Sequence, residues 1–298
     1  MRFRIGAALA TVYVVWGSTY LGMAVAIRSL PPFLMSSVRF LLAGGILYLW
    51  TRRLGRPTLA EIVAAAMSGT ALLVIGNAGI AWAEQRIDTG VAALLVSAMP
   101  LWLALQDRAV FGRRLRRQQV LALAVGLAGV FILVDPSGRG IDLVGALACI
   151  VACFSWAAGS LYIRRAPLPS EPLRAASLQM VSAGVVLAVI AAAHGERIHH
   201  VSLASAGALS YLIVVGSIIA FTAYGWLLRN APTPLVGTYA FVNPAVAVLL
   251  GWAFNGERVG MRTVAAGAAI VVSVALTVIP RVPLPRVVPL ARPQPDRG

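Results

Sequence analysis

Ten long apolar stretches constrain the fold of this chain more than any other feature of its sequence. A helix needs about 20 apolar residues to cross a bilayer, and most of the stretches reach that length. They cover about residues 5–27, 33–50, 60–83, 90–110, 118–134, 143–163, 175–193, 203–228, 234–254 and 261–279. With a mean hydropathy of +0.85 and 12% charged residues, the chain is too apolar for a soluble domain. We predict an all-α polytopic membrane protein of ten transmembrane helices.

The order of residues around the fourth stretch returns around the ninth. Four identical pairs lie 144 positions apart, namely Trp82 and Trp226, Pro100 and Pro244, Gly112 and Gly256, and Arg114 and Arg258. The spacing predicts two related halves, residues 1–136 and 141–280, followed by a Pro- and Arg-rich tail, residues 281–298, that is expected to be disordered. Each half has five segments, so the second half crosses the membrane in the opposite sense. Inverted repeats of this kind recur in secondary transporters.

The basic residues indicate the topology. All 25 are Arg, so the Lys of a phosphate-binding P-loop or of a Schiff-base enzyme is absent. Most of the Arg residues fall in alternate loops, which the positive-inside rule assigns to the cytoplasm. Both termini are therefore predicted to be cytoplasmic. The net charge of +15 then reflects membrane topology, and no nucleic-acid partner is predicted.

Two prolines fall near the middle of apolar segments. Pro100 lies in the fourth segment and Pro244 in the ninth. Proline removes a backbone donor and frees the carbonyl four residues earlier, and inside lipid that carbonyl needs another partner. We interpret the pair as hinges beside a polar cavity. The alternative is two packed kinks, because proline is common in membrane helices.

Polar and aromatic residues gather on the first, third, fourth, sixth, eighth and ninth segments. The fifth and tenth are nearly pure Ala, Val, Leu and Gly, which predicts peripheral helices and self-association through them. The residues predicted to bind a small-molecule substrate are Trp16, Arg39, Asn77, Trp102, Trp156, Tyr239 and Asn243. Two structural roles are the alternatives: aromatic residues also anchor helices at the membrane interface, and buried Asn residues also join helices.

Arg39 is the one charge well inside a predicted span, about six residues from the outer end of its segment. A charge at such a position is costly and marks a candidate functional site. A solute carboxylate would be a suitable partner; the alternatives are snorkelling to the interface and a structural bond to backbone carbonyls. No Asp or Glu lies in the central part of any span. Proton-coupled carriers usually keep a buried acid, so transport is predicted to be uncoupled or weakly coupled.

The sequence predicts no cofactor, no metal site and no enzymatic activity. Cys149 and Cys153 lie four apart on one expected helix, where disulfide geometry is rarely met. His194, His199 and His200 share one loop that carries no further metal ligands. An enzyme would need an acid–base or metal constellation, and the His residues are far in sequence from any Ser or Cys within the spans.

Four groups of residues carry a family resemblance: Trp16-Gly17-Ser18, Arg39-Phe40, the prolines Pro100 and Pro244, and Phe254-x-Gly256-Glu257. They resemble the drug/metabolite transporter superfamily, in its EamA-domain branch, over nearly the whole chain. Arg113 departs from the pattern, because it stands where the second half has Glu257. The resemblance implies ten helices in inverted halves, a bacterial inner-membrane location and export of small metabolites, most often amino acids, by alternating access. The alternative within the superfamily is efflux of drugs or cations, which is less favoured because no buried acid would attract a cation.

Overall fold

The computed structural model describes residues 2–112, 117–134, 141–163, 165–231 and 239–278, and this part of the chain is helical with no strand. The longer α-helices are α1 (Arg2–Ala26), α2 (Pro32–Thr51), α7 (Arg117–Val134), α8 (Leu143–Ile163), α9 (Pro172–Ala193), α13 (Tyr239–Asn255) and α14 (Met261–Val278). The shorter elements are η1 (Arg52–Leu54), α3 (Leu59–Gly69), η2 (Thr70–Ala78), α4 (Gly79–Ala83), α5 (Thr89–Val96), α6 (Met99–Phe111), α10 (Leu203–Tyr211), η3 (Leu212–Phe221) and α11 (Thr222–Asn230). Several short elements join end to end. Within the described ranges, seven helical segments, joined or single, are long and apolar enough to cross a membrane. The predicted turn at residues 135–138 and the tail at 281–298 lie outside the described residues.

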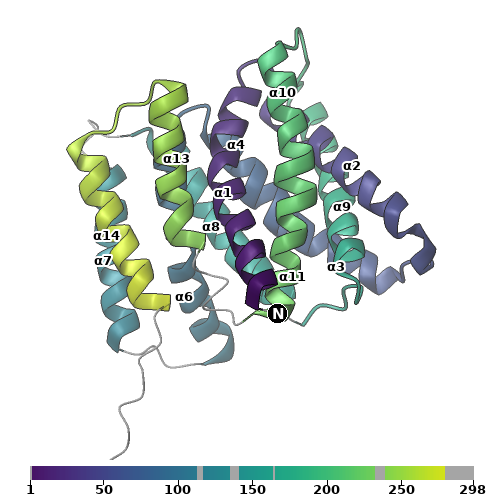
Figure 1. Ribbon diagram of the computed structural model, residues 1–298, viewed down its shortest axis with the longest axis horizontal. Coiled ribbons are helices and arrows are strands. Elements are labelled where there is room, and N and C mark those ends of the chain that lie inside the picture. The colour runs from purple at the N-terminus through teal and green to yellow at the C-terminus, as the bar shows by residue number, and fades with distance from the viewer. Residues whose placement is uncertain (1, 113–116, 135–140, 164, 232–238, 279–298) are drawn as a thin grey trace, which may run out of the picture.

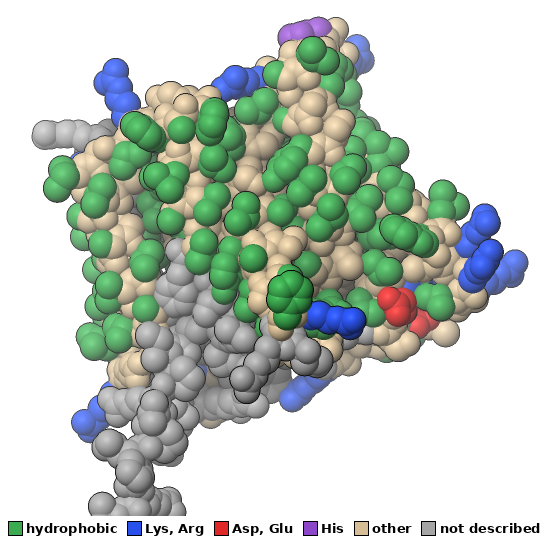
Figure 2. Space-filling view, in the orientation of Figure 1, with side chains coloured by type: hydrophobic (Ala, Val, Ile, Leu, Met, Phe, Trp, Pro, Cys, Tyr) green, Lys and Arg blue, Asp and Glu red, His purple; other side chains and the backbone are tan. Residues whose placement is uncertain are grey.

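The two ends of the bundle differ in their charged residues. At one end, the Glu196 carboxylate accepts hydrogen bonds from the N–H groups of Phe33 (3.4 Å) and Leu34 (2.7 Å), which start α2. Glu257 caps the start of α5 in the same way. We call this the glutamate end; it contains the connections at residues 27–31, 84–88, 194–202 and 256–260. Hydrophobic side chains are spread over the visible face between the charged edges of the molecule (Figure 2).

The opposite end carries most of the described arginines, and we call it the arginine end. Its members include Arg52, Arg53, Arg56, Arg108, Arg117 and Arg165. One arginine there is structural: Arg174 at the start of α9 donates to the Gly55 carbonyl oxygen (2.8 Å) and lies 4.2 Å from the centre of the Tyr48 ring. It ties the start of α9 to the end of α2, and these two helices lie side by side (Figure 1).

Helix α1 runs through the middle of the bundle and packs against α13, η3 and α10 (Figure 1). The approach to α13 is very close at Gly17. A Cβ atom there would lie 2.6 Å from the Val246 Cβ and 3.2 Å from the Asn243 carbonyl oxygen. Glycine is therefore required at this crossing by lack of space, as in other membrane helix pairs that meet at small residues.

We expect Gly17→Ala to destabilise the protein, because its methyl group would force α1 and α13 apart. Overpacking of this kind costs about 1–3 kcal/mol. Gly6 is the matched control, since it lies on the same helix and a Cβ added there would meet no atom within 4 Å. Gly6→Ala should therefore be neutral or slightly stabilising. Thermal unfolding in detergent measures both variants. Equal midpoints for the two would contradict the close crossing.

Helices α7 and α14 form a pair on one flank of the bundle (Figure 1). A Cβ added at Gly129 would lie 2.9 Å from the Ile270 side chain, and the Ser273 hydroxyl donates to the Ala122 carbonyl oxygen. The small residues of α7 and α14 thus pack largely against each other within one chain. Outward-facing side chains such as Phe131 (66% exposed) remain uncovered, so self-association through these helices stays a prediction that can involve only their outer faces.

Two long helical segments change from α- to π-helix in mid-course. The first is η2, between α3 and α4, and the second is η3, between α10 and α11. Shifting residues 70–78 by the 144-residue offset gives 214–222, which nearly coincides with Leu212–Phe221. The same irregularity therefore occupies corresponding positions of the two related regions. Wide π-turns inside helices are frequently found at functional sites.

The two prolines take different positions in their helices. The fourth predicted segment is divided into α5 and α6 by Ser97 and Ala98, and Pro100 lies in the first turn of α6. Proline is favoured there because the missing N–H has no partner to lose. The sequence placed Pro100 near the middle of a segment, whereas in the structure it lies at the start of a helix. Pro244 does lie inside α13, where it is buried. Hinge motion at either proline stays a prediction.

Candidate functional site

A cavity of about 70 Å³ lies in the middle of the bundle. Residues of α1, α2, η2, α4, α5, α6, α8, α9, η3 and α13 line it, and none of the described lining residues comes from α7 or α14. These elements correspond to the first four predicted segments and the sixth to ninth. The cavity is therefore built from both related regions of the chain.

The cavity brings together six of the seven residues predicted to bind substrate. They are Trp16, Arg39, Asn77, Trp156, Tyr239 and Asn243. Other lining residues with polar or aromatic side chains were not predicted from the sequence to bind substrate; they are Thr19, Tyr20, Phe40, Ser217 and Phe221. Hydrophobicity alone could not separate these from core positions, because similar residues face lipid or protein elsewhere in the chain.

Arg39 is held in the cavity wall by side chains of both π-helical stretches. Its Nε donates to the Ser217 Oγ of η3 (2.8 Å), and its Nη1 donates to the Asn77 Oδ1 of η2 (3.0 Å). The residue is 3% exposed. The fixed guanidinium therefore links the two π-helical stretches, η2 and η3.

No described carboxylate pairs with Arg39. A guanidinium has five N–H donors, and protein groups satisfy only part of them here. An unpaired buried charge is costly, so an anion that enters the cavity gains a favourable partner. A planar carboxylate can meet the guanidinium with two parallel hydrogen bonds. The charge of the cavity wall thus favours a carboxylate ligand.

Aromatic rings surround Trp16 on the α1 side of the cavity. Its ring centre lies 4.7 Å from that of Tyr224, 5.3 Å from that of Tyr239 and 5.8 Å from that of Trp156. The buried indole N–H of Trp156 has no hydrogen-bond partner among the described residues. Such rings offer apolar contact and can also attract an ammonium group by a cation–π interaction.

Asn243 connects two of the helices that form the wall. Its amide nitrogen, in the orientation that satisfies its neighbours, lies 3.1 Å from the carbonyl oxygen of Tyr13 and 3.2 Å from that of Tyr239. The amide thus joins α1 to the first turn of α13. This geometry gives Asn243 a role in helix joining beside its position in the cavity wall.

Trp102 lies apart from the other six predicted residues. Its ring packs edge-on against Phe154, with the ring centres 5.8 Å apart. It lines a second, mostly apolar hollow between α6 and α8, together with Gln106, Val110 and Arg165. The sequence could not place Trp102, because the break between α5 and α6 resets which residues of the segment face the centre.

The chain matches the EamA-like transporter family twice, over residues 4–135 and 143–279. The chain belongs to this family. The two matches to this EamA transporter family fall on the two related regions of the chain.

Relatives of this EamA protein include the uncharacterized inner membrane transporter YedA of Escherichia coli (strain K12), which is 38% identical over 86% of each chain. The probable amino-acid metabolite efflux pump of Salmonella typhimurium is 25% identical over 83% of this chain and 87% of the relative. A protein of known crystal structure has a similar fold, with a TM-score of 0.66 and 20% identity over 91% of this chain and 95% of that one.

Proposed function

We propose that this EamA transporter exports amino acids or similar carboxylate-bearing metabolites across the bacterial inner membrane by alternating access, without obligatory coupling to an ion gradient. The observation that carries the proposal is Arg39, a buried cation without a carboxylate partner among the described residues, in the wall of the central cavity. The names of the relatives, an inner membrane transporter and a probable amino-acid metabolite efflux pump, support it.

The substrate site in this proposal is the wall around Arg39 and the aromatic rings. The guanidinium holds the solute carboxylate, and the Trp156 indole N–H supplies a further donor. Trp16 and Tyr239 contact the apolar part of the solute or its ammonium group. The protein performs no covalent chemistry on the solute, so it acts as a carrier and not as an enzyme.

The proposed topology has ten membrane-crossing segments, with the arginine end and both termini in the cytoplasm. Residues 1–136 and 141–280 form two inverted repeats, with 281–298 as a cytoplasmic tail. The cavity between the repeats then opens alternately toward each side. The partners of the protein are its solute and the lipid bilayer.

Efflux of cationic drugs is the competing function within the family. A cation would need a carboxylate or a neutral polar site, yet the only charge among the described cavity-lining residues is the positive Arg39. A lipophilic cation would therefore have to bind to the aromatic faces against the repulsion of the guanidinium. The geometry favours the carboxylate solute.

Uptake of radiolabelled amino acids into proteoliposomes with equal pH and equal salt on both sides tests the function. We expect uptake that reaches equilibrium and exceeds that of protein-free liposomes. A strict requirement for an imposed pH gradient would contradict uncoupled transport. Movement of a lipophilic cation such as tetraphenylphosphonium, with no movement of any amino acid, would reverse the choice between the two functions.

A further inference from the structure

Glu84 lies at the glutamate end, directly after α4 and just outside its apolar span. Its backbone N–H donates to the carbonyl oxygen of Ile80 (2.9 Å), one helical turn earlier. Ile80 lines the central cavity. Glu84 therefore occupies the layer of protein that separates the cavity from this end of the bundle.

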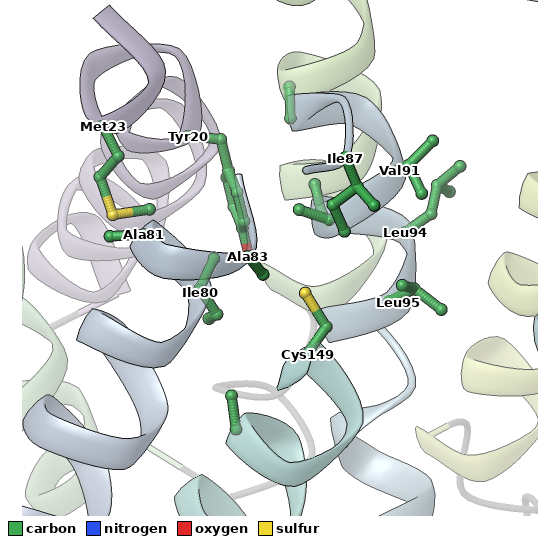
Figure 3. Close-up of a cluster of buried hydrophobic side chains, with 14 of the residues drawn as sticks. Tyr20, Met23, Ile80, Ala81, Ala83, Ile87, Val91, Leu94, Leu95 and Cys149 are labelled. Carbon is green, nitrogen blue, oxygen red and sulfur yellow. The ribbon is translucent and has the colours of Figure 1, made fainter. Parts of the chain in front are cut away.

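Both carboxyl oxygens of Glu84 are buried and have no hydrogen-bond partner among the described residues. The apolar cluster around this position includes Tyr20 of α1, Ala83 and Ile87 on either side of Glu84, and Cys149 of α8 (Figure 3). An ionised carboxylate in such a place would lose its water without gaining a partner, which is energetically costly. The structure buries Glu84 at this end, which we call the closed glutamate end, and therefore favours the neutral carboxylic acid.

The charged and titratable neighbours do not supply a cation for Glu84. Tyr20 and Cys149 face it from α1 and α8, and the Glu257 carboxylate interacts with it from the connection after α13. Burial, and then the charge of Glu257, raise the pKa of Glu84 well above its ordinary value.

The nearby basic residues are engaged elsewhere. Arg86 lies 3.9 Å from the centre of the Trp82 ring, and Arg28 donates to Asn255. Asp88, the other carboxyl of this connection, is exposed at the surface. Partial desolvation, and then Glu257, raise the pKa of Asp88 as well, so it serves as a matched control.

We propose that Glu84 is a proton-binding site that operates with the glutamate end: the closed end holds the carboxylic acid, and opening releases its proton to water on that side. The O–H bond breaks, the carboxylate keeps the electron pair, and a water molecule of the opened end accepts the proton. Closing reverses the step. Because the proton leaves and returns on the same side, no proton crosses the membrane, and transport responds to pH without being driven by a pH gradient.

The sign of the pH effect follows from proton linkage. Glu84 has a raised pKa in the closed state and, as an exposed carboxyl, an ordinary pKa of about 4.3 in the open state. At any pH between these two values, the closed state binds one more proton than the open state. Raising the pH within this window therefore favours opening, by about tenfold per pH unit. This inference goes beyond the proposed function and does not depend on which solute is carried.

Infrared spectroscopy of the purified protein tests the first part without any solute. We expect wild type at neutral pH to show the C=O stretch of a protonated carboxyl, which Glu84→Gln removes and Asp88→Asn retains. Glutamine has nearly the shape of the neutral acid, so the variant should fold. An unchanged band in Glu84→Gln, or the absence of a band in wild type, would overturn the proposal.

Labelling of Cys149 by a membrane-impermeant maleimide tests the second part, in a Cys153→Ala background. Cys149 is fully buried in the closed structure, and its label rate depends on both the thiolate fraction and opening of the glutamate end. The Glu84→Gln variant keeps the pH dependence of the thiolate fraction but removes the pH dependence of opening. We expect the ratio of wild-type to Glu84→Gln rates to rise about tenfold per pH unit. A ratio that stays constant between pH 6 and 8 would show that opening releases no proton from Glu84.

Discussion

Replacing Arg39 with glutamine is expected to weaken carboxylate binding in the central cavity by about a hundredfold or more. Breaking a buried charge pair by removing one partner typically costs about 3–5 kcal/mol, and each 1.4 kcal/mol changes affinity tenfold. Glutamine can still bond to Asn77 or Ser217, which hold Arg39 in wild type. The loss should therefore fall on the solute more than on the fold.

Arg39→Lys separates charge from geometry. Lysine keeps the positive charge but has no planar fork for two parallel hydrogen bonds, so we expect an intermediate loss. Arg174→Gln is the matched control, because Arg174 is also a buried arginine but lies at the arginine end and outside the cavity. Equilibrium binding of a radiolabelled amino acid to each purified variant measures the effect. The proposal that Arg39 binds the solute would be wrong if Arg39→Gln kept wild-type affinity, or if Arg174→Gln lost more affinity than Arg39→Gln.

Replacing Glu257 with alanine should produce the largest loss of stability among the acidic residues of the glutamate end. The Glu257 carboxylate accepts hydrogen bonds from the N–H groups of Thr89 (2.9 Å) and Gly90 (3.1 Å), from the Thr89 hydroxyl and from the Asn255 amide (2.9 Å). It also places negative charge at the positive end of the α5 dipole. Losing a helix cap together with further charged hydrogen bonds should lower the free energy of unfolding by about 2–3 kcal/mol.

Glu196→Ala is the natural comparison for Glu257→Ala. Glu196 caps α2 through two backbone N–H groups, one of them at 3.4 Å, so its removal should cost about 1 kcal/mol. Denaturant unfolding in one detergent gives both values. Glu257→Ala should also speed the labelling of Cys149, because the cap joins α5 to the connection after α13 and helps to close the glutamate end. A smaller effect for Glu257 than for Glu196 would contradict this role.

The helical nature of the chain and much of the cavity could be predicted from the sequence. Long apolar runs define the helices, and polar or aromatic interruptions such as Trp16 and Trp156 mark those that face the centre. Arg39 was identifiable for the same reason, because a charge within an apolar run has no inexpensive place in lipid. The lack of such interruptions in α7 and α14 predicted their position at the flank.

Other parts of the site depend on tertiary structure that no local pattern reveals. The π-helical stretches that position Asn77 and Ser217 have no distinct composition. The break at Ser97 and Ala98 turns Trp102 toward a different hollow. Glu84 falls in a connecting segment where an acid would ordinarily reach water, and only the packing of helices distant in sequence buries it.

The central claim is that the cavity recognises a carboxylate through Arg39, and competition among matched solutes tests it most directly. The solutes are leucine, the amine that leucine gives on decarboxylation, and the carboxylic acid that remains when its amino group is replaced by hydrogen. Each competes with radiolabelled leucine for purified wild-type protein and for Arg39→Gln. We predict that leucine and the acid compete for wild type, that the amine competes at least a hundredfold more weakly, and that Arg39→Gln loses this preference. Equal competition by the amine and the acid in wild type would contradict the account.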